Sequence, residues 1–335
     1  MLAAGEYRQN RRRNRILISV IAMAVCMVFG TFSLALGKIQ TDYLLYVRSA
    51  GTAASTTLEY PDEAQYRQIQ KLLYIRETGW QKIFGSTNDF YCTVLDQTAW
   101  KSLQMPAYTD IHGHYPKKTA EVMLPKRALD SLHIKKPSIG MKISLAIRIG
   151  EKKTQKETFI LSGWYTEYVD PMVSLPYGYF SEKYLEQNVE TEDITATLLI
   201  HQEESLTGEE VEERLYRDVK MRDDSQQFFG GTSMSLQSVA EVAGGYGMAW
   251  VMAGVIVLSA WLLIYNVLHI SYAKDVRQYG MLKTLGTTQR QLRSIAFRQI
   301  LRLAMEGSLM GSIAGSAFVI LVLPRLLSGM YLQGL

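Results

Sequence analysis

Three long apolar windows constrain the fold of this chain more than any other feature. Residues 16–36, 247–268 and 303–323 together contain a single formal charge, on Glu306. Each window is about as long as the roughly 20 apolar residues that cross a bilayer. We therefore predict a multi-pass α-helical membrane protein and exclude soluble, disulfide-stapled and nucleic-acid-binding classes, so that nucleic acid is not an expected partner. The predicted transmembrane helices are residues 16–37, 247–270 and 303–323.

The distribution of charge around the windows predicts their orientation. The N-terminal segment has five arginines before the first window, opposed only by Glu6, and residues 269–302 have seven basic residues opposed only by Asp275. The long segment 38–248 instead carries 23 basic and 29 acidic residues. Because Lys and Arg near span ends favour the cytoplasmic side, we expect a plasma-membrane protein with a cytoplasmic N-terminus. The cytoplasmic parts are then 1–15 and 271–302, and the extracytoplasmic parts are 38–246 and a short tail, 324–335.

A cleaved signal peptide is the alternative for the first window, with Ala35-Leu36-Gly37 as a passable cleavage site. The apolar region of a signal peptide usually has about 7–15 residues, fewer than this window has. We therefore favour an uncleaved membrane anchor.

The outer segment reads as an irregular mixture of strands and helices, which predicts an α+β domain. Cys26 lies in the first window and Cys92 stands alone outside, so a core rather than a disulfide must stabilise this domain. Residues 38–60 are expected to continue the first helix and then turn polar. The predicted strands are 90–95, 121–124, 141–149, 158–165, 172–175 and 195–200. The predicted helices are 61–75, 97–104, 125–133, 181–188, 206–222 and a short one within 235–244.

Catalytic and metal-binding patterns are weak in this sequence. His112 and His114, with Asp110 and Glu121 nearby, fall short of a closed metal set, so we interpret them as a surface loop. The glycines and lysine over 30–38 do not have the spacing of a phosphate-binding loop. We predict no catalytic residue, no metal site and no cofactor bound by this chain.

The connector between the second and third windows has the pattern of two helices joined by a corner. Residues 273–285 carry apolar side chains along one helical face, and Gly286 follows where a helix commonly ends. Thr288 and Gln291 form a capping-box pattern for the next helix. A stiff basic corner of this kind suits docking into a soluble partner, and an interfacial connector held by lipid headgroups is the alternative.

Small residues recur every four positions in the third window. Gly307, Gly311 and Gly315 form one stripe, with Ser308 and Ser312 beside them. Such a stripe lets another helix approach closely, so we predict helix packing at these five residues. Glu306 lies near the inner end of this window, and we expect it to be solvated or paired with a connector Arg.

These residues carry a family resemblance. The run from Asp275 to Arg293, followed by Glu306 and the glycine stripe, resembles the signature of FtsX/MacB-type permease subunits of ABC transporters, in the form found in Firmicutes FtsX-like permeases. Residues 8–37 and 119–165 resemble the family less strongly. Gln278-Tyr279 stands where many relatives have Glu-Ile before the glycine, so an ionic contact made by that Glu is absent. The complete family module has a fourth span, which is absent here, and we therefore expect the N-terminal part of a longer permease.

The resemblance implies a permease subunit that couples ATP hydrolysis to movement of the outer domain. The chain itself is then not an enzyme, since ATP and Mg²⁺ are bound by a separate ABC ATPase subunit. Further implied partners are a second permease copy or half, membrane lipid, and an outer protein or peptide. The expected ATPase-coupling residues are Tyr279, Gly280, Leu282, Lys283, Leu285, Gly286, Thr287, Thr288 and Gln291.

Three functions follow from this sequence. The leading one is export, detoxification or lipid-leaflet extraction of a peptide or amphipathic substrate. The alternative is an FtsX-like transmitter that regulates a cell-wall hydrolase or a sensor kinase without transport. The third class is a passive membrane-anchored adhesin or scaffold. Such a protein would need neither the basic corner nor the glycine stripe.

Overall fold

The computed structural model describes residues 11–150, 154–222, 227–244, 247–284 and 289–325. The chain divides into two compact units. The first, which we call the membrane unit, comprises residues 1–39 and 243–335, and the second, the outer unit, comprises residues 40–242.

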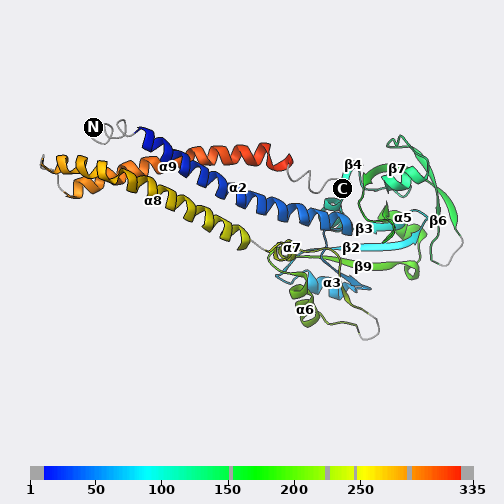
Figure 1. Cartoon of the computed structure of the whole chain (residues 1–335). Helices are drawn as coiled ribbons and strands as arrows, with labels where there is room; N and C mark the ends of the chain where they lie inside the picture. The colour runs from blue at the N-terminus through cyan, green and yellow to red at the C-terminus, as the bar shows by residue number, and fades with distance from the viewer. Residues whose placement is uncertain (1–10, 151–153, 223–226, 245–246, 285–288, 326–335) are drawn as a thin grey trace. The chain divides into compact units, whose positions relative to one another are not determined.

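Three long helices form the described part of the membrane unit (Figure 1). They are α2 (Arg11–Ala50), α8 (Gly247–Thr284) and α9 (Gln289–Leu321). Each contains a segment long and apolar enough to cross a membrane, so the predicted three apolar helices are confirmed. The 40 residues of α2 span about 60 Å, roughly twice the hydrocarbon thickness of a bilayer, and its last turns belong to the outer unit.

The outer unit is built on one mixed sheet, and its predicted α+β class is confirmed. Among the described residues the strand order is β10-β1-β9-β2-β3-β8-β5-β7-β4, with β6 also paired to β7. The pairs β3/β8 and β5/β7 are parallel, and the other pairs are antiparallel. The strands are β1 (Thr56–Glu59), β2 (Ile75–Ser86), β3 (Tyr91–Leu95), β4 (Thr109–Gly113), β5 (Glu121–Pro125), β6 (Lys142–Ile147), β7 (Gln155–Thr166), β8 (Tyr177–Phe180), β9 (Thr195–Gln202) and β10 (Phe229–Gly231).

Short helices connect and cover these strands. Their starts follow capping rules: Asp62 and Gln65 form a capping box for α3, and Thr207 and Glu210 form one for α6. The helices are α3 (Glu63–Ile69), α4 (Lys126–Ser131), α5 (Glu182–Asn188), α6 (Gly208–Asp218), α7 (Leu236–Val242), a π-helix η1 (Ala99–Gln104) and the 3₁₀ turns η2 (Met105–Ala107) and η3 (Thr191–Asp193).

Three apolar clusters stabilise the outer unit. One centres on Phe84, Phe159 and Phe180, and a second on stacked aromatic rings that include Tyr108 and Tyr165. The third packs α3 and α6 against β1 and β9. Cys92 is buried and reduced, and Cys26 is also free. The core therefore depends on apolar burial, as the sequence predicts.

The structure corrects several predicted elements. The predicted strand 172–175 is wrong: these residues form a turn and loop in which Met172 and Val173 are 96% and 80% exposed. The predicted surface loop around His112 is in part the edge strand β4, which pairs with β7 through an irregular register. Strands β1, β2, β4, β8 and β10 were not predicted, and α3 ends at Ile69 rather than at residue 75.

Candidate functional site

Helices α9 and α2 of the membrane unit pack closely at three glycines of α9. A Cβ atom added at Gly307 would lie 2.8 Å from Ile21 Cβ, and one at Gly311 would lie 2.5 Å from the Ala22 carbonyl oxygen. At Gly315 it would lie 2.8 Å from the Phe29 ring. These approaches are shorter than any side chain tolerates. We call this contact the glycine seam, and it exists because the three positions of α9 have no side chain.

Ser308 and Ser312, which neighbour the glycines of the seam in the sequence, do not take part in it. Gly307, Gly311 and Gly315 are buried, whereas Ser308 and Ser312 are exposed within the described chain. Of the five residues for which the sequence predicts packing, the structure thus brings the glycines to α2 and leaves these two serines uncovered. Helical spacing explains the split, because adjacent positions point about 100° apart around the axis.

Two further contacts within the membrane unit are an ion pair on α9 and an aromatic pair between α8 and α2. Glu306 accepts a hydrogen bond from Arg302 Nε at 2.8 Å, so this carboxylate is paired with a connector Arg, as the sequence predicts. On α8, Trp250 meets Phe32 of α2 edge to face, with ring centroids 5.0 Å apart. Over residues 247–267 of α8, most of the other apolar side chains are exposed within this chain, among them Val255, Leu258 and Trp261.

The predicted connector consists of the ends of two long helices. Tyr279, Gly280, Leu282 and Lys283 lie in the last turns of α8, and Gln291 lies in the first turn of α9. Leu285, Gly286, Thr287 and Thr288, including the predicted cap, lie outside the described residues. The structure therefore places one helix end and one helix start on either side of the predicted corner. The coupling role of these nine residues stays a prediction.

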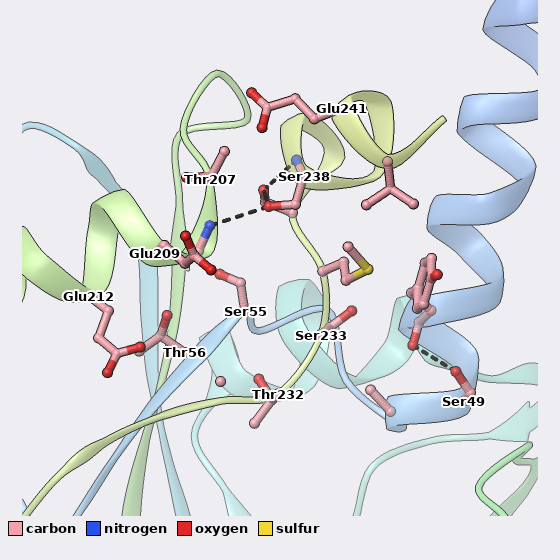
Figure 2. Close-up of a pocket in the computed structure, with 17 residues that line it drawn as sticks. Ser49, Ser55, Thr56, Thr207, Glu209, Glu212, Thr232, Ser233, Ser238 and Glu241 are labelled. Atoms are coloured by element: carbon pink, nitrogen blue, oxygen red, sulfur yellow. Dashed lines mark hydrogen bonds between the residues drawn. The ribbon is translucent and has the colours of Figure 1, made fainter. Parts of the chain in front are cut away.

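The outer unit contains a hollow of about 710 Å³ (Figure 2). Its lining comes from the end of α2, the start of α6 and the segment around α7. Within it, Gly208 N donates to Ser238 Oγ at 3.3 Å, and Ser238 N donates to Ser235 Oγ at 3.1 Å. Ser235 therefore caps α7, and Ser238 ties α7 to α6.

Acidic and hydroxyl side chains dominate this hollow. Figure 2 shows Glu209 and Glu212 on α6 and Glu241 on α7. Within the described chain, the lining includes no His, Cys or basic side chain. Tyr46 on α2 and Val242 at the end of α7 also line it, and all the lining residues belong to the outer unit.

The side chains of the weak metal-binding pattern have other contacts. His112 stacks on Trp164 with ring centroids 5.0 Å apart, and His114 Nδ1 lies 3.0 Å from the Tyr115 carbonyl oxygen. Glu121 accepts hydrogen bonds from the backbone N–H groups of Lys117 and Lys118. Among the described residues, no three His, Cys, Asp or Glu side chains come together as a metal site would need.

One ion pair of the outer unit joins a buried carboxylate to a partly exposed arginine. Arg127 Nη2 lies 2.8 Å from Glu167 Oε1, and the Glu167 side chain is only 4% exposed. Burial raises the pKa of Glu167, while Arg127 and the backbone N–H of Val169 act in the opposite direction. The same arginine donates to the Val169 carbonyl oxygen at 2.9 Å. It therefore fixes the loop that follows β7.

These features define an integral membrane protein: three apolar helices, one tight helix seam and a mixed α/β outer unit. Residues 250–334 match the family model described as FtsX-like permease C-terminal. The predicted resemblance to FtsX-like permeases is therefore confirmed for the segment that contains most of α8 and all of α9. No curated protein matches this chain.

Three solved structures are similar to the outer unit. The extracellular domain of the noncanonic ABC-type transporter YknZ from Gram-positive bacteria aligns at 8% identity and TM-score 0.34, covering 53% of this chain and 98% of that one. The periplasmic region of MacB from Actinobacillus actinomycetemcomitans aligns at 8% identity and TM-score 0.33, covering 56% of this chain and 92% of that one. A domain of a permease protein from Porphyromonas gingivalis aligns at 7% identity and TM-score 0.31, covering 54% of this chain and 89% of that one. Likenesses at this level support no argument about function.

The hollow of Figure 2 was not predicted from the sequence. Its lining comes from segments around residues 46–56, 207–212 and 231–242, which are far apart in the chain. Only the capping box at Thr207 and the Gly/Ser-rich run before α7 were local signals. Neither pattern indicates a shared cavity.

Proposed function

We propose that this chain is the permease subunit of an ABC-type transporter. The observation that carries the proposal is the FtsX-like permease match over residues 250–334, a segment that contains most of α8, the predicted corner and α9. ATP and Mg²⁺ would then be bound by a separate ATPase subunit that docks at the corner. A second permease copy or half would complete the transporter, and the N-terminus would be cytoplasmic.

Continuous helices support a mechanical role for the corner. The 38 residues of α8 run without a break from Gly247 to Thr284, over about 57 Å. A push at the corner would therefore reach the far end of α8, and α8 follows α7 of the outer unit along the chain. The glycine seam joins α9 to α2, whose last turns belong to the outer unit. Both routes lead from the corner to the outer unit.

The transported molecule is a peptide or another amphipathic substrate in this proposal. Export, detoxification and extraction from the outer leaflet all require the outer unit to change shape while the substrate moves. An FtsX-like transmitter would use the same helices and move nothing. Vesicle transport distinguishes the two: ATP-dependent movement of substrate is expected for the permease, and an ATP-dependent change in the outer unit without movement would identify the transmitter.

The docking role of the corner has a direct test. We expect the double change Leu285→Asp and Gly286→Asp to abolish recovery of an ABC ATPase subunit when the chain is purified from native membranes and its partners are identified by mass spectrometry. The matched control is Leu73→Asp with Met172→Asp, because both side chains are 96% exposed in the outer unit. Undiminished recovery of the ATPase with the corner variant would count against the proposal.

The orientation has a separate test. A cysteine placed at Thr288, in a chain with Cys26 and Cys92 replaced by Ala, should react with a membrane-impermeant maleimide only after the cells are opened. Labelling of intact cells at this position would place the corner outside, where no ATPase could reach it.

A further inference from the structure

A second hollow, of about 480 Å³, lies in the outer unit next to η1. Its size falls within the roughly 300–1,000 Å³ typical of small-molecule sites. Two aromatic side chains, Trp100 and Tyr115, line it, with ring centroids 5.2 Å apart. Leu95 adds an aliphatic surface. The hollow therefore has an apolar wall against which a flat apolar group of a ligand can pack.

The aromatic walls are held in place by the surrounding structure. The Tyr115 hydroxyl accepts from Leu95 N at 2.7 Å and donates to Leu95 O at 3.2 Å, so its hydrogen bonds are used within the wall. Trp100 is 9% exposed and meets Tyr179 edge to face. A rigid aromatic wall costs little ordering entropy when a ligand binds.

The charges around the hollow leave it cationic. Lys101, Lys117 and His114 all line it, and neither lysine forms an ion pair with another described residue. Asp96 is the acidic residue of the lining, and its two carboxylate oxygens accept from Ala99 N at 2.7 Å and Trp80 N at 3.0 Å. Both Asp96 oxygens are therefore directed at backbone N–H groups, and the lining carries two exposed ammonium groups against this one carboxylate.

The backbone at this place is also unusual. Trp100 and Lys101 lie on the π-helix Ala99–Gln104. π-helical turns are rare and occur frequently at functional sites. Here the wide turn brings an aromatic and a cationic side chain, adjacent in sequence, to the same hollow.

We propose that this hollow binds a small amphipathic anion, in which a flat apolar group carries an acidic substituent. The apolar group lies against Trp100 and Tyr115, and the acidic group lies at the rim near Lys101 and Lys117. The lining combines both kinds of contact: the two aromatic rings suit the apolar group of the ligand, and the two lysines suit its acidic group. Binding at this hollow does not depend on the proposed transport function.

Two matched probes test the proposal. Indole-3-propionate and tryptamine share an indole ring and differ mainly in the charge at the end of a short chain. With the full chain in nanodiscs of neutral phosphatidylcholine, and empty nanodiscs as a blank, saturation-transfer NMR should detect binding of indole-3-propionate and not of tryptamine. Equal binding of the two, or no binding of the anion, would overturn the proposal. Inorganic phosphate at the same concentration should not displace the probe, and displacement would show that the apolar group is irrelevant.

The lysines locate the site. The double change Lys101→Gln and Lys117→Gln should weaken indole-3-propionate binding about tenfold, the combined effect expected of two exposed charge contacts. Lys135→Gln with Lys136→Gln removes the same charge from exposed positions outside the lining and should change nothing. Both pairs lie on the surface, so folding is preserved. Equal weakening by the two pairs would show that the anion responds to net charge and would refute this site.

Discussion

The membrane unit and the outer unit hold their elements together in opposite ways. Along the glycine seam, α9 meets α2 because Gly307, Gly311 and Gly315 lack side chains. In the outer unit, large rings fill the space: Phe180 is fully buried and meets Phe84 edge to face, with ring centroids 5.3 Å apart. The solvent explains the difference. Water drives apolar side chains together, whereas lipid does not, so helices in lipid associate through close packing.

The largest expected effect comes from removing volume in the outer unit. Phe180→Ala should lower the free energy of unfolding of the outer unit by about 4 kcal/mol, because it deletes a ring from a closely packed cluster and leaves a cavity. Hydrogen exchange of β3, β5 and β8, followed by mass spectrometry of the full chain, measures this. Leu73→Ala is the control, since Leu73 is 96% exposed. If the two variants exchanged alike, ring burial would not be what stabilises this unit.

The reciprocal change adds volume to the membrane unit. Gly311→Leu should destabilise the seam by about 3 kcal/mol, because its Cβ would lie 2.5 Å from the Ala22 carbonyl oxygen. The readout is a disulfide between cysteines that replace Phe29 and Gly315, with Cys26 changed to Ala, whose yield should fall sharply. Gly254→Leu is the matched control, since nothing lies within 4 Å of a Cβ at that glycine. An unchanged yield in the Gly311 variant would mean that the seam is not close-packed.

Local patterns made part of this fold predictable. Strands β3, β5, β6, β7 and β9 were predicted near their observed positions because their apolar residues and turn boundaries lie within a few positions of one another. The three apolar helices were predictable for the same reason, since crossing a membrane requires one unbroken apolar run. The glycine stripe of α9 was visible in the sequence. Its partner on α2, a set of ordinary apolar residues, was not.

Elements determined by distant contacts were missed. Strand β2 contains Gly79 and Gly85, which break the strand pattern. A Cβ at either glycine would lie 2.5 Å from a backbone atom of another segment, at Ala99 or Arg148. Only glycine fits at these two positions, because a later segment of the chain packs directly against the β2 backbone there. The neighbouring residues in the sequence do not indicate this contact. The hollow of Figure 2 likewise depends on distant contacts, because its lining comes from segments far apart in the chain. The predicted strand 172–175 failed because its apolar residues face solvent.

A smaller effect is expected where the outer unit buries charge rather than rings. Arg127→Met should destabilise the outer unit by about 2 kcal/mol, because it leaves the nearly buried Glu167 carboxylate without its cation. Thermal unfolding at neutral pH measures the loss. Since burial already raises the pKa of Glu167 and Arg127 opposes that effect, the variant should recover part of its stability as the pH is lowered and the carboxyl group becomes neutral. Lys126→Met, which changes the exposed neighbouring residue, is the control and should show neither effect.

The smallest expected effect concerns a histidine within the sheet of the outer unit. His201 lies in β9, its Nδ1 is 2.9 Å from the Ala53 carbonyl oxygen, and burial lowers its pKa below the ordinary 6.5. Below pH 6.5 the unfolded chain therefore binds a proton that the folded chain resists, so stability is complete above that pH and falls as the pH decreases through it. His201→Gln should flatten this part of the stability curve, and His133→Gln, at an exposed position, should leave it unchanged. If the slopes of wild type and His201→Gln coincided, His201 would not contribute to the pH dependence of stability, and burial of its ring would carry no measurable electrostatic cost.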